Sequence, residues 1–366
     1  MQQSTADPVA NSYARQAAGI VLRDRGETAL ALTELRVAVK TAEASGLADR
    51  VADVRATMGI SLVTAGRTKS GLAELDAAAG EAHGLLLARV LMRRADAFAK
   101  LGRYPEALTD LRLAIAGFRS AKDTVWEAWA LNNRANIHSA RGALTRAEAD
   151  LGRAEELFRT AGQPLEVAAA VQNRGAIASC RGDIPATLAL YDEAARGCAA
   201  LMVSWPELAF DRCQAYLAAG LTREAVTVVE EALAEAALTP IMRAELLCVG
   251  ATAALADGEP DAALASSHQA RRLFHRQGRD WWEARADLIE LRAKYARGER
   301  GGRLVASAEQ VGERLASLRS DDAPVALLLA GRLAAIRDPD SAHRQLSAAA
   351  RYRRHTSALV RASRAR

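Results

Sequence analysis

A glycine that returns at a nearly constant interval is the feature that most constrains how this chain can fold. Eight glycines separate pairs of segments with helical periodicity, at intervals of 36 to 40 residues: Gly26, Gly66, Gly102, Gly142, Gly182, Gly220, Gly258 and Gly298. One more interval of 40 residues leads to the dipeptide Asp338-Pro339. A fixed period in this range is the sequence signature of a repeat architecture. We therefore expect nine repeats.

Other residue types recur at fixed distances from each turn glycine. An alanine stands twelve residues after eight of the nine turns: Ala38, Ala78, Ala114, Ala154, Ala194, Ala232, Ala270 and Ala350. Another alanine stands five residues after the turn in five repeats: Ala31, Ala107, Ala147, Ala225 and Ala263. The ninth residue after the turn is Leu35, Leu75, Leu111, Leu151 or Tyr191 in the first five repeats. The sixteenth residue after the turn is Phe118, Phe158 or Phe274 in three repeats. These positions indicate a helix, a tight turn at a left-handed glycine, and a second helix that packs closely on the first.

This pattern resembles the tetratricopeptide repeat (TPR) family, which also places a small residue seven positions before the turn. That residue is Gly19, Gly59, Ala95, Ala135, Gly175 or Ala251 here. The resemblance implies an all-α fold, a right-handed α-solenoid of about nine TPR-like helix-turn-helix repeats, over residues 10–352. The repeats are longer than the usual ~34 residues. The eighth repeat departs furthest, with Arg303 at the small-residue position and Gly301-Gly302 opening its second helix, so we expect the array to bend or fray there.

A narrower resemblance covers part of the array. Three segments are similar to the TPR region of actinobacterial proteins that carry a C-terminal CHAT domain, a caspase-like cysteine peptidase: LNNRANIHSARGALTRAEADLGRAEELFRTAG, RGDIPATLALYDEAA and DRCQAYLAAGLTREA. Because the repeats run to the end of the sequence, we expect no room for that domain. The resemblance then implies a regulatory or sensing module.

The charge of the chain is concentrated at its C-terminus. The last sixteen residues hold six arginines and no acid, which leaves 43 basic residues against 44 acidic ones elsewhere. We expect residues 353–366 to be a frayed or disordered basic tail, with nucleic acid an unlikely partner except weakly through this tail. The most apolar run, Val325 to Ile336, is too short to span a bilayer. The sequence also opens with a polar segment, so we expect a cytoplasmic protein with no membrane partner.

Polar residues on the first helix of each repeat are the candidate ligand-binding positions. In TPR arrays the first helices line a concave groove that binds extended peptides. Counting back from each turn predicts a row of polar side chains on this face: Arg89, Arg93, Asp96, Asn132, Asn133, Asn136, Gln172, Asn173, Asp211 and Gln214. An asparagine amide both donates to and accepts from a peptide backbone, and an arginine can bind a carboxylate. The alternative is that a solvated face simply needs polar residues.

Two further sets of residues recur in register. Arginine stands eight residues before four successive turns: Arg94, Arg134, Arg174 and Arg212. We favour structural ion pairs between repeats over ligand binding for these, with Glu81, Glu127, Glu166 and Glu207 as candidate partners. The tryptophans lie near the start of first helices: Trp126, Trp129, Trp205, Trp281 and Trp282. Packing between repeats is the favoured interpretation, and an exposed aromatic rim that docks a partner is the alternative.

The sequence gives little support to catalysis. Cys180 and His138 fall on neighbouring first helices, but their positions differ by two residues relative to the turn, so they should point apart. The histidines show no metal-ligand spacing, and neither a phosphate-binding loop nor a dinucleotide fingerprint is present. The four cysteines lie far apart in the sequence, so we expect them to be reduced and mostly buried thiols. We therefore expect a protein that is not an enzyme and needs no cofactor.

The function expected from the sequence is that of a non-enzymatic scaffold or regulatory module. Such a module would bind a protein or peptide partner in its concave groove. Two alternatives remain open: the regulatory half of a CHAT-type peptidase system, and the sensor part of a transcription regulator with its DNA-binding domain elsewhere.

Overall fold

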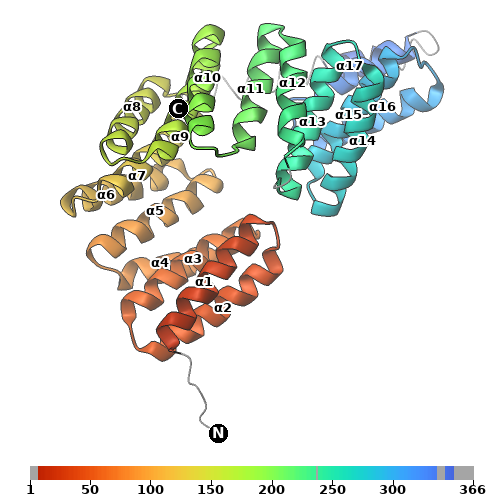
Figure 1. Ribbon diagram of the computed structural model, residues 1–366. Helices are drawn as coiled ribbons and strands as arrows, with labels where there is room; N and C mark the ends of the chain where they lie inside the picture. The colour runs from red at the N-terminus through yellow and green to blue at the C-terminus, as the bar shows by residue number, and fades with distance from the viewer. Residues whose placement is uncertain (1–6, 236–237, 336–342, 350–366) are drawn as a thin grey trace. The chain divides into compact units, whose positions relative to one another are not determined.

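The structure is a computed structural model, which describes residues 7–235, 238–335 and 343–349. Every regular element in these ranges is a helix (Figure 1). The helices are α1 (Pro8–Asp24), α2 (Thr28–Ser45), α3 (Ala48–Thr64), α4 (Thr68–Glu81), α5 (Gly84–Lys100), α6 (Tyr104–Ser120), α7 (Thr124–Ala140), α8 (Leu144–Thr160), α9 (Pro164–Arg181), α10 (Ile184–Ala200), α11 (Pro206–Ala219), α12 (Thr222–Leu233), α13 (Pro240–Ala256), α14 (Pro260–Gln277), α15 (Asp280–Ala296), α16 (Gly302–Ser317) and α17 (Ala323–Ala334), and residues 343–349 are also helical.

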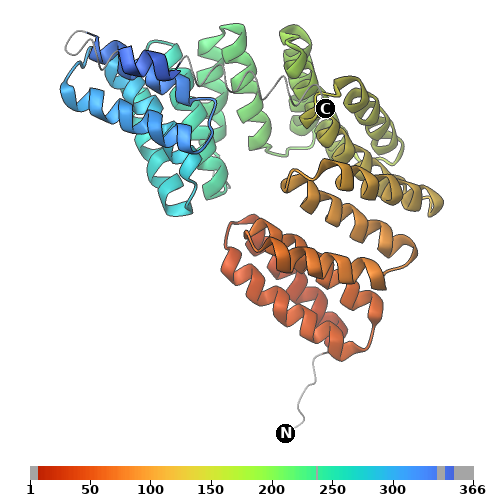
Figure 2. The same cartoon turned by 180° about the vertical axis from the view of Figure 1, so that it is seen from behind.

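The chain divides into two compact units, Met1–Met202 and Val203–Arg366. The first unit contains α1 to α10 and the second contains α11 to α17, and each is described by itself (Figure 2). The single array expected over residues 10–352 stays a prediction. The basic tail expected at residues 353–366 lies outside the described residues.

Successive helices form the expected hairpins, and the odd-numbered first helices also pack on one another. In the first unit α3 contacts both α1 and α5, and α7 contacts both α5 and α9. In the second unit α13 contacts both α11 and α15. The all-α fold of repeated helix pairs predicted from the sequence is therefore confirmed.

The turn glycines adopt the conformation that the sequence predicts. All eight have a positive φ, between 72° and 88°, which L-residues rarely adopt. The ninth turn, expected at Asp338-Pro339, lies outside the described residues.

The small residue before the turn and the large residue after it touch one another. A Cβ added to Gly175 would lie 2.5 Å from the ring of Tyr191, and one added to Gly19 would lie 2.6 Å from Leu35. Real Cβ atoms do not approach other atoms so closely. In these two repeats the helices therefore approach so closely at this point that a side chain is excluded.

The second helices bury one residue set that follows the turn at fixed distances. In α8 this set is Ala147, Leu151, Ala154 and Phe158, each at most 1% exposed. In the eighth repeat the set moves one residue further from its turn, to Leu304, Ala308, Val311 and Leu315, all buried. Because α16 begins four residues after Gly298 and α8 only two after Gly142, Arg303 stands outside the small-residue position. The expected departure of this repeat is confined to the start of its second helix.

The tryptophans of the WEA triplets pack between successive repeats. Trp126 stacks on Phe118 with ring centroids 6.0 Å apart, and Trp282 stacks on Phe274 at 5.3 Å. Each pair is eight residues apart in sequence, so the same contact recurs in both units. This confirms packing as the role of these two side chains. Over the described part of the chain, no helix is long and apolar enough to cross a membrane.

Candidate functional site

A pocket of about 300 Å³ lies between α5 and α7 in the first unit, with α6 closing one side. Its floor is apolar, formed by small side chains of α5 together with Leu111 and Ile137. Polar side chains also line the pocket: Asp96, Lys100, Asn133 and Asn136, with the phenol of Tyr104. Three of these, Asp96, Asn133 and Asn136, belong to the row predicted from the sequence. We call this site the α5–α7 pocket.

The amides of Asn133 and Asn136 are available to a ligand. Asn133 is half-buried and Asn136 is exposed, and they lie three residues apart on α7, so they share one face. Neither amide makes a hydrogen bond to any residue that the structure describes. Each amide offers two donors and one acceptor, which matches the alternating groups of an extended backbone.

The charges of the pocket are paired with each other. The Lys100 ammonium donates to both carboxylate oxygens of Asp96, at 2.8 and 2.9 Å, across one turn of α5. The two side chains are 46% and 43% exposed, so the pair is screened by water. Exposed pairs of this kind contribute about 0–1 kcal/mol. A ligand can therefore displace either partner at small cost, and the pocket itself is close to neutral.

Asn132 has a different role from its neighbours. It is 5% exposed, and its Oδ1 accepts a hydrogen bond from Nδ2 of Asn173 on α9 at 2.8 Å. This bond ties the first helices of two successive repeats together. The residue before Asn173, Gln172, is half-buried on the same helix. Two of the predicted groove residues thus pair with one another.

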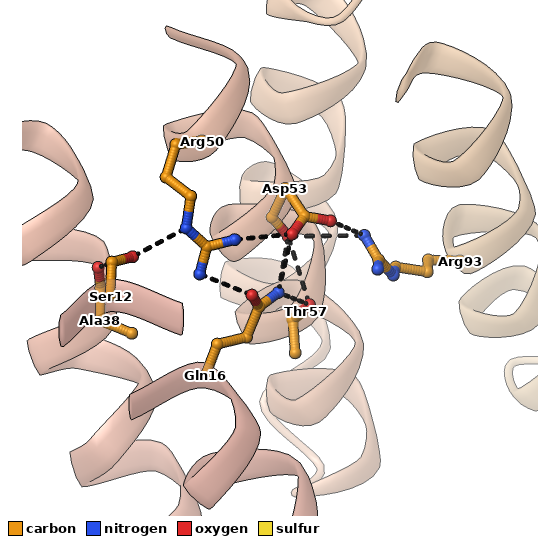
Figure 3. A network of polar contacts seen from close by, with 7 residues as sticks. All are labelled: Ser12, Gln16, Ala38, Arg50, Asp53, Thr57 and Arg93. Carbon is orange, nitrogen blue, oxygen red and sulfur yellow. Dashed lines mark hydrogen bonds and ion pairs between the residues drawn. The ribbon is translucent and has the colours of Figure 1, made fainter. Parts of the chain in front are cut away.

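Arg93 is also held by the protein. Its Nη1 donates to Oδ1 of Asp53 on α3 at 2.6 Å (Figure 3). Burial by itself raises the pKa of Asp53, but the charge and hydrogen bond of Arg93, with help from Gln16 and Arg50, outweigh it and lower the pKa below its usual value. Arg93 therefore faces a carboxylate of its own chain.

Figure 3 shows a polar network behind Asp53 that we did not predict from the sequence. Arg50 is 4% exposed and donates to Ser12 at 3.0 Å, to Gln16 at 2.6 Å and to Asp53 at 2.8 Å. Gln16 in turn donates to Thr57 at 2.7 Å. The sequence signal was the spacing of Arg50, Asp53 and Thr57, which places three polar side chains on one face of α3.

Arg89 lies at the other end of α5, against the start of α7. Its guanidinium lies 5.1 Å from the ring of Trp126 and 3.8 Å from the carboxylate of Asp123. Its buried Nε makes no hydrogen bond among the described residues. Such cation–π contacts contribute about 0.5–1 kcal/mol at exposed sites.

The last two predicted residues lie on α11, in the second unit. Asp211 is half-buried and Gln214 is exposed. These residues belong to the other compact unit, and the continuation of the row to them stays a prediction.

Three of the arginines eight residues before the turns form ion pairs, with other acids than those expected: Arg94, Arg134 and Arg174. The expected pairing between repeats holds for Arg94, which binds Asp76 on α4 at 2.9 Å, and for Arg174. Arg94 and Arg134 bind Asp110 and Asp150, which stand eight residues after the same turns. Hydrogen bonding to these carboxylates raises the pKa of both guanidinium groups. The pairing therefore closes each hairpin.

The third arginine of this set pairs across repeats. Arg174 binds Glu148 and Glu155 on α8, at 2.9 and 2.8 Å. Two of the acids expected as partners bind elsewhere, because Glu81 pairs with Arg55 and Glu127 pairs with Arg119. The last arginine of the set, Arg212, donates to the hydroxyl of Tyr216 on its own helix.

All four cysteines lie in the described part of the chain as free thiols. Cys180 is exposed, while Cys198, Cys213 and Cys248 are buried. Burial raises the pKa of Cys213 and of Cys248 to about 12, so both thiols stay protonated at neutral pH. Burial likewise lowers the pKa of His138, although Asp150 opposes this.

Comparisons with known proteins agree with this architecture. Residues 86–160 match the family model of the tetratricopeptide repeat, and this stretch contains the α5–α7 pocket. No curated protein gives a match in sequence.

Solved structures share the fold at low sequence identity. The apo form of RapI is 9% identical, with 94% of this chain and 98% of that chain covered and a TM-score of 0.65. A Rap protein in complex with Competence and Sporulation Factor is 13% identical, with 95% and 99% covered and a TM-score of 0.60. A STAND protein with a tetratricopeptide repeat sensor, from Pyrococcus horikoshii, is 12% identical, with 79% and 52% covered and a TM-score of 0.57. The chain thus has the fold of a TPR-like α-solenoid, and its residues 86–160 match the model of the tetratricopeptide repeat.

Proposed function

We propose that this chain is a protein-interaction module that binds an extended segment of a partner protein in the α5–α7 pocket. The observation that carries the proposal is the pair of free amides, Asn133 and Asn136, beside an apolar floor. In this arrangement an apolar side chain of the partner enters the pocket, and the amides bind the backbone on either side of it. Each such hydrogen bond contributes about 0.5–1.5 kcal/mol net.

Three other predicted groove residues of the first unit have supporting roles in this proposal. Asn132 and Asn173 hold α7 and α9 together, and Arg93 is anchored by Asp53. They fix the helices whose exposed faces meet the partner. A preorganised site binds better because less conformational entropy is lost on binding.

The fold of the similar structures supports an interaction role. A Rap protein of this fold was crystallised together with Competence and Sporulation Factor, and that structure covers nearly the whole of this chain. The pocket volume of about 300 Å³ lies at the small end of ligand pockets, about 300–1,000 Å³, and suits one side chain better than a whole cofactor.

The proposal can be tested by affinity purification from the native cell with quantitative mass spectrometry. The test protein is the double variant Asn133→Ala/Asn136→Ala. The control is Gln310→Ala, which removes an exposed amide from α16. We expect at least one co-purifying protein to be lost with the double variant and retained with the control. An identical set of partners for all three proteins would overturn the assignment of this pocket.

A regulatory role beside a CHAT-type peptidase is the finer form of this proposal. It rests on the sequence similarity of residues 131–225. We expect a caspase-like protein among the partners that the double variant loses. If the lost partners include none, the module serves another system, and the pocket assignment stands.

A further inference from the structure

A second pocket lies in the second unit, on α13, α15 and α17. Its volume is about 360 Å³. Its lining is Leu255, Arg292, Tyr295, Ala296, Val325, Leu328, Leu329 and Arg332. We call this site the α15–α17 pocket.

The two pockets occupy the same positions within their repeats. Arg292 stands six residues before Gly298, as Asp96 and Asn136 stand six residues before their own turns. Tyr295 stands three residues before its turn, as Ala99 does in the α5–α7 pocket. The same surface of the repeat is therefore hollowed in both units, and its side chains differ.

The α15–α17 pocket carries unpaired positive charge. Arg292 and Arg332 are exposed, and neither makes an ion pair or a hydrogen bond with any residue that the structure describes. Neighbouring arginines of this unit do have acidic partners, as Arg314 has in Glu283. Among the residues that the structure describes, no acid lines the pocket, so the described lining carries a net positive charge.

The pocket also exposes apolar surface. Val325 is 42% exposed and Leu328 is 43% exposed, three residues apart on one face of α17. Leu329 and Tyr295 continue this surface into the pocket. A partner that covers these apolar side chains removes them from water, which favours binding.

We propose that the α15–α17 pocket binds an acidic segment of a partner protein. One apolar side chain of this segment enters between Val325, Leu328 and Tyr295. Flanking Asp or Glu side chains bind Arg292 on one helix and Arg332 on the other. A carboxylate forms two parallel hydrogen bonds with a guanidinium, which makes arginine selective for such groups.

Charge argues against the chain's own C-terminal segment as the occupant. The last sixteen residues hold six arginines and no acid, so they would be repelled by Arg292 and Arg332. The α5–α7 pocket has its charges paired and two free amides, so the two sites select different partners. The second site is independent of the first.

The test uses a random peptide library displayed on phage and the full chain as bait. We expect the selected peptides to share an apolar residue with acidic residues on both sides. The variant Arg292→Glu/Arg332→Glu should lower the affinity for such a peptide at least tenfold, measured by fluorescence polarisation. The same reversal should select peptides with basic flanks.

A matched control makes the same change of charge outside the pocket. Arg272→Glu/Arg276→Glu alters two exposed arginines of α14, and we expect its affinity to stay within twofold of the wild type. Leu328→Ser should weaken binding without changing the preference for acidic flanks. Circular dichroism would show that each variant is folded.

Three results would overturn the proposal. The first is a peptide consensus without acids, and the second is equal binding by the Arg292→Glu/Arg332→Glu variant. The third comes from sedimentation, where a dimer of the wild type and a monomer of this variant would make a second copy of the chain the occupant. The variant Asn133→Ala/Asn136→Ala should bind the selected peptides with the same affinity as the wild type. The two proposals, one for each pocket, can therefore be refuted independently of each other.

Discussion

Removing Arg134 should destabilise the first unit by leaving a buried carboxylate without its charged partner. Nε and Nη2 of Arg134 donate to the two oxygens of Asp150, at 2.7 and 2.6 Å, and Asp150 is 8% exposed. His138 lies 3.9 Å from Asp150, and burial lowers the pKa of its imidazole, which is therefore mostly neutral at pH 7.5. After Arg134→Ala, the charge of Asp150 therefore loses the guanidinium that binds both of its oxygens.

The expected magnitude follows from the burial of the pair. Breaking a fully buried ion pair costs about 3–5 kcal/mol. Because the Arg134 side chain is 27% exposed, water reaches the pair, and we expect about 2–3 kcal/mol for Arg134→Ala. The double variant Arg134→Ala/Asp150→Ala should cost less than the single one, since no buried charge is left unpaired. The coupling energy of the double-mutant cycle should be about 1–2 kcal/mol.

Hydrogen exchange read by mass spectrometry measures this locally, on peptides from α7 and α8. A local measurement is needed because a protein with two units need not unfold in one step. Arg153→Ala is the control, since its pair with Glu156 is exposed and should contribute less than about 0.5 kcal/mol. If Arg134→Ala and Arg153→Ala changed the hydrogen exchange of α7 and α8 equally, or if the double-mutant cycle gave no coupling energy, the stabilising role assigned to the Arg134–Asp150 ion pair would be wrong.

Three further outcomes can be checked by thermal unfolding. Gly175→Ala should cost about 1–3 kcal/mol, because its Cβ would meet the Tyr191 ring, whereas Gly152→Ala, on an exposed part of α8 with open space around it, should be neutral or stabilising. Burial raises the pKa of Asp287 to about 6 although Arg271 and Arg314 oppose this, so the destabilisation by its charge is absent below its unfolded pKa of about 3.9, grows as the pH rises and is complete above about pH 6. Asp287→Asn should therefore raise the melting temperature at pH 8, and this gain should vanish near pH 3.5. The pKa of Asp53 is lowered, so the stability it contributes is present above its unfolded pKa of about 3.9 and is lost at lower pH. The wild type should exceed Asp53→Asn in stability at pH 7, and this difference should shrink as the pH falls below about 4; an unchanged difference at pH 3 would contradict it.

The fold could be predicted because most repeats have similar residue types at the same structural positions. The backbone at Gly142 adopts the left-handed conformation that glycine favours. The contact of Gly175 with Tyr191 leaves no room for a side chain at position 175. Such requirements are local, so they can be counted along the sequence. The error of register found among the described repeats, in the eighth, came from a longer loop before α16 that the glycine count does not reveal.

The candidate site was predictable only in part, because a helix separates adjacent residues by about 100°. Asn132 and Asn133 are neighbours in the sequence, yet one binds Asn173 and the other lines a pocket. Which of them is free depends on how α7 packs on α9. The network of Arg50 and Asp53 was missed for the same reason, since Gln16 comes from another helix.

The positions that repeat and the positions that vary have different roles in this chain. Arginine recurs eight residues before the turn, and Arg94 and Arg134 there bind acids within their own hairpins. By contrast, the residue six before the turn changes in nearly every repeat: Ile20, Ile60, Asp96, Asn136, Ala176, Gln214, Thr252 and Arg292. This variable position lines both pockets, as Asp96 and Asn136 in one and as Arg292 in the other. A fold that fixes one position by ion pairs leaves the other free to change, so partner selection should follow the residue six before the turn. Exchanging Asn136 for arginine would test this, since it should shift peptide selection at the α5–α7 pocket towards acidic segments without loss of stability.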